Sequence, residues 1–89
     1  MAHKESEELL SDLDKLKQFV NTGDKFYHYK HPEQHYLILA VGFIEDTEEP
    51  CVIYQAEYGE KFVWVRTQDE FFAKVDLDGT QVDRFTKII

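Results

Sequence analysis

The chain has 89 residues, of which 43% are hydrophobic and 15% aromatic, and 18 acidic against 10 basic side chains give a formal net charge of −8. This length corresponds to one small domain with a compact core. The charge argues against nucleic acid and anionic membranes as partners, because both are bound through clustered Lys and Arg. The lone Cys51 excludes an internal disulfide and is expected to be buried, and with no stretch long enough for a membrane span we predict a cytoplasmic protein.

The first predicted element is an amphipathic helix over residues 6–20, with Ser6 as its N-cap and Gly23 as its C-terminal stop. So short a helix is marginal alone, so we expect it to dock on its own domain or on a second copy of the chain, as a homodimer. It forms an N-terminal helical extension, residues 1–22, added to a β-domain, residues 23–89. Its apolar stripe recurs at helical spacing: Leu9, Leu13, Leu16 and Val20.

Two strands are expected next. Residues 24–31 form the first, and residues 31–34 form a turn, because Pro32 removes a ladder donor. Residues 35–44 are hydrophobic on both faces and predict a central strand covered on both sides. Gly42 is expected to mark a bulge or a sharp bend in that strand.

The central hairpin, residues 51–66, is the most informative stretch. A three-residue loop at Gly59-Glu60-Lys61 places Tyr54 opposite Arg66 and Ala56 opposite Trp64. Two interpretations of one face stay open. As a structural surface, it forms a wall of the core or the surface on which the helix packs. As a functional surface, it is an aromatic groove with a fixed guanidinium, suited to a peptide, a carboxylate or a stacked base. This face combines polar-tipped aromatic side chains with a cation: Val52, Tyr54, Ala56, Tyr58, Phe62, Trp64 and Arg66.

The last third of the chain carries turn signals. Thr67 is expected to cap a short helical turn, and Asp78-Gly79 is the strongest two-residue hairpin turn. Several short strands with tight turns predict a mainly β fold, a small SH3-like or OB-like barrel with an added N-terminal helix.

Catalytic and metal-binding motifs are weak. His28, beside two tyrosines and Lys30, could act in acid–base chemistry, but no nucleophile sits in an activating context and no phosphate-binding loop is present. His31 and His35 lie near His28 in sequence, yet no Cys or well-placed acid completes a zinc set, and His3 is treated as incidental. We therefore expect no catalytic residues, metal or cofactor.

Several motifs in order make the run from Gly23 to Phe85 resemble the domain-of-unknown-function 1653 family of small bacterial proteins. Family members look like SH3-type barrels, so the resemblance implies that fold, and it implies no activity because none is established for the family. The family usually has Leu where this chain has Glu57, which implies that the odd-numbered hairpin face looks inward. The chain also departs from the family at Tyr27, Thr67 and Asp83, where Arg, Pro and Pro are usual. The matching residues are Gly23, Phe26, His28, Tyr29, Lys30, Val52, Tyr54, Gln55, Ala56, Tyr58, Gly59, Trp64, Val65, Arg66, Phe71, Lys74, Val75, Gly79, Arg84 and Phe85.

These features favour a non-enzymatic module that binds a small ligand or a peptide. The alternatives are an enzyme or enzyme-accessory domain that uses His28, and a structural dimerisation unit that uses the helix. A deep pocket with His28 beside Arg66 would favour the enzyme. A shallow open groove would favour the binding module, and a groove filled by the chain's own helix would favour the structural unit. The expected ligand-binding residues are His28, Tyr29, Tyr54, Tyr58, Trp64, Arg66 and Arg84.

Overall fold

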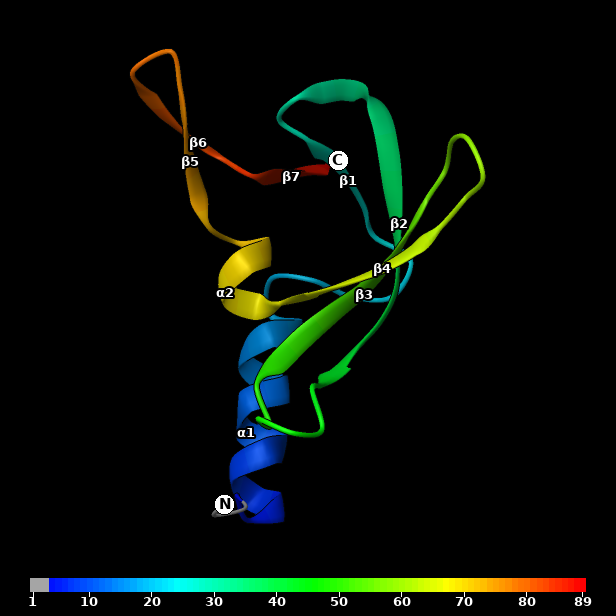
Figure 1. Ribbon diagram of the computed structural model, residues 1–89. Coiled ribbons are helices and arrows are strands. Elements are labelled where there is room, and N and C mark those ends of the chain that lie inside the picture. Colours follow the sequence, from blue (N-terminus) through cyan, green and yellow to red (C-terminus); the bar gives the residue numbers. More distant parts are fainter. Residues whose placement is uncertain (1–3) are drawn as a thin grey trace.

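The computed structural model describes residues 4–89 (Figure 1); residues 1–3, and with them His3 and the start of the helical extension, lie outside the described part. No helix in this part is long and apolar enough to cross a membrane. In chain order the elements are α1 (Ser6–Lys17), β1 (Lys25–His28), β2 (His31–Phe43), β3 (Pro50–Ala56), β4 (Val63–Thr67), α2 (Gln68–Phe71), β5 (Lys74–Leu77), β6 (Thr80–Asp83) and β7 (Phe85–Ile88).

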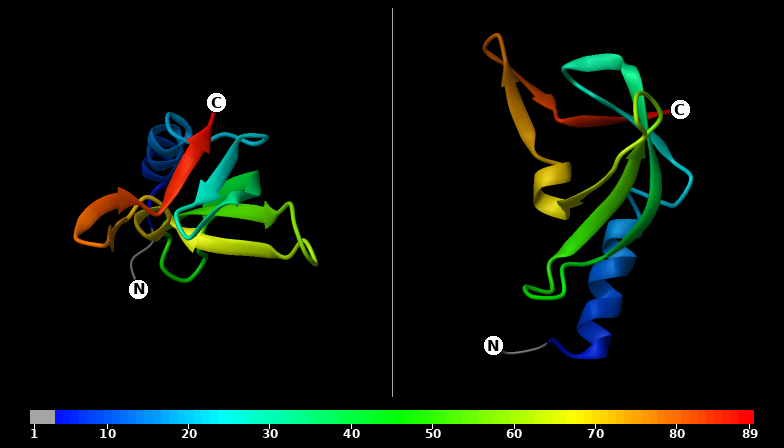
Figure 2. Two further views of the ribbon diagram at one scale, coloured as in Figure 1. Left: turned by 90° about the horizontal axis from the view of Figure 1, so that it is seen from above. Right: turned by 45° about the vertical axis from the view of Figure 1, so that its right-hand side comes forward.

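Five strands form one antiparallel sheet in the order β4-β3-β2-β1-β7, and β5 and β6 form a separate hairpin. The sheet curls around a concave face, and the β5–β6 hairpin projects away from it (Figure 2). Its edge strands β4 and β7 do not pair, so the barrel is not closed. The predicted mainly β fold with an N-terminal helix is confirmed, and the open, curled sheet is compatible with an SH3-like barrel. The predicted central strand is confirmed as β2, which begins four residues earlier than predicted. It is not fully covered on both sides, because Ile38 is buried and most of its other apolar residues are half-buried.

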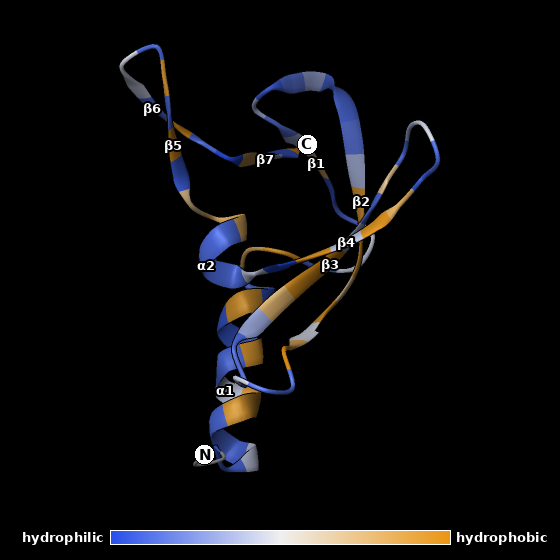
Figure 3. Ribbon diagram, viewed as in Figure 1, coloured by the Kyte–Doolittle hydropathy of each residue, from blue (hydrophilic) through white to orange (hydrophobic). Residues whose placement is uncertain are grey.

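The core lies on the concave face, at the end that the two helices cover. Apolar residues follow α1, β2 and β3 toward this end, whereas the β1–β2 turn is hydrophilic (Figure 3). The rings of Phe71, from α2, and Phe85, from β7, stack with centroids 4.3 Å apart and planes 3° apart. Burial of these side chains is the main source of stability in so small a domain. The buried cluster comprises Leu16, Val20, Phe26, Ile38, Val52, Tyr54, Phe71 and Phe85.

The helix α1 docks on its own domain by its C-terminal end. Leu16 and Val20 are buried in the core, while Leu10 remains 61% exposed. The predicted N-cap was wrong: Glu5 takes the N-cap position and makes no side-chain cap hydrogen bond. The helix also ends at Lys17, earlier than predicted, and the chain then turns so that Val20 still reaches the core.

Two local predictions in the sheet were wrong. The turn between β1 and β2 lies at Tyr29-Lys30, because His28 already pairs with His31. The irregularity in β2 lies between Ile38 and Ala40, and Gly42 keeps a regular pairing with the next strand. In contrast, the Thr67 cap of α2 and the Asp78-Gly79 turn between β5 and β6 are confirmed, the first by a hydrogen bond from the Glu70 N–H to the Thr67 hydroxyl.

The central hairpin has a longer loop than predicted. Tyr54 pairs with Trp64 and Val52 with Arg66, a shift of two residues from the expected register. A shift of two leaves every side chain on its predicted face. The even-numbered face is the concave one, since Val52 and Tyr54 are buried in the core, so the expectation that the odd-numbered face looks inward was wrong. That expectation relied on the leucine usual in the family at this position; in this chain Glu57 follows the end of β3 and forms an exposed ion pair with Lys25.

Candidate functional site

The concave face continues beyond the core into a pocket of about 410 Å³ that is partly open to solvent. This volume lies in the range of small-ligand sites. The pocket is bounded by the β1–β2 turn, by β3 and β4, by α2 and by the start of β7. Its lining residues are His28, Lys30, His31, Tyr36, Tyr54, Trp64, Val65, Arg66, Glu70 and Phe85.

Four of the predicted site residues line this pocket: His28, Tyr54, Trp64 and Arg66. The other three lie outside the lining. The ring of Tyr29 lies 4.7 Å from that of His28, the Tyr58 hydroxyl pairs with that of Tyr36, and Arg84 lies between β6 and β7.

Sequence reasoning missed the other six lining residues, among them Tyr36 and Phe85, which complete the pocket from β2 and β7. The pairing of β2 with the predicted hairpin could have found Tyr36, because residues directly opposite each other share a face. Tyr36 pairs with Ala56 on the aromatic face, and Phe85 pairs with His28. The pairing of β1 with β7 joins residues far apart in sequence, and no local sequence pattern predicts it.

Arg66 is the best-defined polar group of the pocket. Its Nε donates to the Tyr54 hydroxyl at 3.1 Å, and its guanidinium carbon lies 5.9 Å from the centroid of the Phe85 ring. Within residues 4–89 its two terminal nitrogens make no hydrogen bond or ion pair. A planar guanidinium held at Nε presents its terminal N–H groups as a fixed fork. The Arg66 guanidinium is therefore held in place at Nε, while its terminal N–H groups have no hydrogen-bond acceptor in the described part of the protein.

His28 is oriented by the backbone of the adjacent turn. The Lys30 N–H donates to Nδ1 of His28 at 3.2 Å, so Nε2 carries the proton of the neutral ring. Burial lowers the pKa of His28, and the neighbouring charges of Arg66 and Lys30 lower it further. His28 is therefore a neutral donor at pH 7.

Burial also keeps the pocket tyrosines in their neutral, protonated form. Burial raises the pKa of the Tyr54 hydroxyl, and the Arg66 hydrogen bond only partly opposes this. Burial and the hydrogen bond with Tyr58 also raise the pKa of Tyr36. Because Tyr54 accepts from Arg66, its own O–H remains able to donate.

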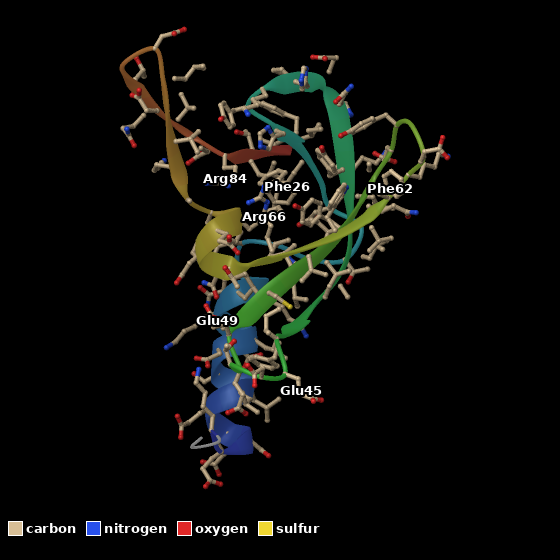
Figure 4. All side chains as sticks on the ribbon, viewed as in Figure 1. Phe26, Glu45, Glu49, Phe62, Arg66 and Arg84 are labelled. Carbon is tan, nitrogen blue, oxygen red and sulfur yellow. The ribbon has the colours of Figure 1, made fainter. Side chains whose placement is uncertain are left out.

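Positive charge gathers at the pocket although the chain is acidic. Both arginines of the chain, Arg66 and Arg84, lie in the space bounded by β4, α2 and β7 (Figure 4). Within the described part of the chain neither they nor Lys30 form an ion pair, and the Nε of Arg84 is buried without a hydrogen-bond partner. Four of the other lysines are paired with carboxylates: Lys4 with Asp12, Lys25 with Glu57, Lys74 with Asp83 and Lys87 with Asp24. Lys15, Lys17 and Lys61 form no ion pair within residues 4–89.

The described residues do not gather a metal site. Across residues 4–89, no three His, Cys, Asp or Glu side chains come together as metal ligands would. His31 contacts Glu33 at 3.5 Å on the surface, and Cys51 is buried, which raises the pKa of its thiol. A buried neutral thiol is a poor nucleophile and a poor ligand.

Comparison with known proteins confirms the resemblance. The family described as "Protein of unknown function (DUF1653)" matches residues 24–87. A crystal structure of a DUF1653 protein from Bordetella bronchiseptica is similar to this chain, with a TM-score of 0.66 and 26% sequence identity over 80% of this chain and 90% of that one. No curated protein matches the chain. Neither match names a ligand or an activity.

Proposed function

This chain belongs to the DUF1653 family of proteins of unknown function, and from that premise we propose that it is a non-enzymatic module that binds a small ligand or a peptide in the concave pocket. The observation that carries the proposal is Arg66, held by Tyr54 inside an aromatic pocket with its terminal nitrogens unused. A fixed donor in a partly apolar concavity is the usual composition of a ligand site. The helix α1 fills the core end of the concave face and leaves this pocket open.

An enzyme is the second candidate, because His28 and Arg66 line the same pocket. General acid–base chemistry or nucleophile activation needs a second reacting group within hydrogen-bond reach of the histidine. Within residues 4–89 the hydrogen bond of the His28 ring is with the Lys30 backbone, and no hydroxyl, thiol or carboxylate is bonded to it. This arrangement favours binding over catalysis.

Dimerisation through α1 is the third candidate. Leu10 is largely exposed on the helix, and Phe19, just after it, is exposed as well. A second copy of the chain could cover both side chains. Sedimentation of the intact protein tests this directly: a monomer at micromolar concentration would contradict it.

The binding function is tested by a fragment screen on the intact, isotope-labelled protein. Trp64, the single tryptophan, lines the pocket, so its fluorescence reports occupancy independently. We expect hits to shift backbone amides of β1, β3, β4 and β7 around the pocket and to change Trp64 emission. The control variant is Phe62→Ala, which alters an exposed aromatic side chain beside the pocket but outside its lining. Hits that shift only amides elsewhere would overturn the proposal.

A further inference from the structure

We propose that the pocket selects a carboxylate, gripped by the terminal nitrogens of Arg66 and carried by a planar apolar body that packs on Trp64. This inference rests on the proposed binding function and names its ligand class. It follows from three features of the pocket: the excess of donors, the geometry of the cation, and the apolar walls.

The hydrogen-bonding groups of the pocket are mostly donors. Arg66 offers four N–H groups on its terminal nitrogens, and Lys30 offers an ammonium without an ion-pair partner in residues 4–89. His28 offers Nε2–H, because its Nδ1 already accepts from the backbone. A ligand that satisfies these groups must be rich in acceptors, and an anion forms stronger hydrogen bonds to them than a neutral carbonyl does.

The cation geometry favours a carboxylate over a doubly charged phosphate. One guanidinium, fixed at Nε by Tyr54, presents the parallel pair of N–H groups that matches two carboxylate oxygens. The net charge of −8 opposes any anion, and opposes a dianion about twice as strongly. Phosphate sites usually add backbone N–H groups from a helix terminus. Here the residue that α2 contributes to the pocket lining is Glu70, whose carboxylate would repel a phosphate.

The same pocket contains one carboxylate of its own, Glu70. Its Oε1 accepts from the Thr67 hydroxyl at 3.1 Å, and it forms no ion pair with Arg66. The start of α2 thus holds Glu70 near the site of the proposed anion, which it must repel. Glu70→Gln keeps the cap geometry and removes that repulsion, so it should tighten carboxylate binding.

The apolar walls of the pocket indicate which chemical group should carry the carboxylate. Trp64 is half exposed at the pocket, and Phe85 lies beneath the Arg66 guanidinium. Tyr36 also lines the pocket, and its ring makes a T-shaped contact with Phe85 at 5.8 Å between centroids. An aromatic or planar body would gain ring contacts on Trp64 and reach the guanidinium with its carboxylate.

The test compares matched acids and amides on the intact protein. The probes are benzoate and 3-phenylpropionate, with benzamide and 3-phenylpropionamide as neutral partners, titrated to ~10 mM because millimolar affinity is expected of such small ligands. Each acid should bind at least about tenfold more tightly than its amide, which corresponds to about 1.4 kcal/mol. Phenyl phosphate serves as the dianion and should bind more weakly than the acids.

Variants locate the effect. Arg66→Gln should weaken acid binding at least about tenfold and leave amide binding unchanged, and Lys30→Gln should weaken it by a smaller factor. Glu70→Gln should act in the opposite direction. Lys61→Gln, which removes the same charge outside the pocket lining, is the matched control and should have little effect. If Arg66→Gln does not fold, the opposite signs expected at Lys30 and Glu70 still decide the question.

The carboxylate could belong to a free small molecule or to the C-terminus of a peptide. A short aromatic peptide with a free C-terminus, compared with its amidated form, separates these sources, since a peptide would also shift amides along β4. Equal binding of acids and amides, or an Arg66→Gln variant that keeps its preference for acids, would overturn the carboxylate inference and leave the binding module intact. Failure of every probe and every screened fragment to shift the pocket amides would overturn both.

Discussion

The two ends of the concave face have the same strands and the same alternation of side chains, yet one end is core and the other is open. At the covered end Phe71 is fully buried and Tyr54 is 4% exposed, whereas at the open end Trp64, which pairs directly with Tyr54, is 50% exposed. The difference comes from the covering elements: α1 and α2 close one end, and nothing in the described chain closes the other. A continuous aromatic surface thus serves stability where it is covered and offers a site where it is not.

Charge partly follows the same division. Several lysines around the covered part of the fold pair with carboxylates, as Lys87 does with Asp24 and Lys25 with Glu57, although Lys15 and Lys17 of α1 form no ion pair within residues 4–89. At the open end, Arg66 and Lys30 have no ion-pair partner in residues 4–89. Exposed ion pairs contribute little to stability, so leaving cations unpaired costs the fold little and leaves them free for a ligand.

The largest effect that separates the two ends is expected from Phe71. Phe71→Ala removes a ring that stacks on Phe85 and is fully buried, so it should lower the free energy of unfolding by about 3–5 kcal/mol. Phe62→Ala, at a position 61% exposed, is the matched control and should cost less than about 1 kcal/mol. Urea denaturation of both variants measures the contrast, and equal losses would contradict the division.

A second contrast lies within α1. Leu16→Ala should cost about 2–5 kcal/mol, because the side chain is buried in the core, whereas Leu10→Ala, on the exposed side of the same helix, should cost less than about 1 kcal/mol. The same denaturation experiment applies. A large loss for Leu10→Ala that depends on protein concentration would instead indicate a dimer interface on α1.

Trp64 should be intermediate. Its ring is half exposed, so Trp64→Ala should cost about 1–2 kcal/mol, well below the value for a buried aromatic ring. The variant should keep its fold and lose affinity for the pocket ligands. A loss as large as that of Phe71→Ala would mean that the open end is also part of the core.

Arg66→Ala should cost still less, about 1 kcal/mol. It removes the hydrogen bond to the Tyr54 hydroxyl but breaks no ion pair within residues 4–89. Tyr54→Phe, which deletes the other partner of the same bond, is the control and should cost about as much. A cost near that of Phe71→Ala would show that Arg66 is a structural element, and the site would then lie elsewhere.

The smallest effect concerns pH. The pKa of His28 is lowered from 6.5 in the folded protein, so the unfolded chain binds more protons in the range below that value. The stability due to neutral His28 is therefore complete above pH 6.5 and is lost as the pH falls toward the lower folded pKa. Wild type should lose more stability than His28→Gln between about pH 7.5 and about pH 5.5. Benzoate should reduce this loss, because a bound anion favours protonated His28.

Much of the local structure was determined by the sequence. The apolar spacing of Leu16 and Val20 predicted which side of the helix is buried, and Asp78-Gly79 predicted its hairpin. Alternation along residues 51–66 also determined which side chains share a face, even though the register was wrong by two residues. These predictions hold because helix and strand periodicity are properties of a few neighbouring residues.

Only the tertiary structure decided which face is concave and which part of it is open. The leucine usual in the family at the position of Glu57 misled the sequence interpretation, because this position lies just past β3, where alternation no longer reports a face. The pocket depends on the pairing of β1 with β7, which brings Phe85 beside His28, and on the point at which the helices stop covering the sheet. Periodicity predicts which side chains share a face, but their burial depends on elements distant in sequence. Tyr54 is therefore buried in the core, whereas Trp64, its partner on the next strand, lies at the edge of the pocket.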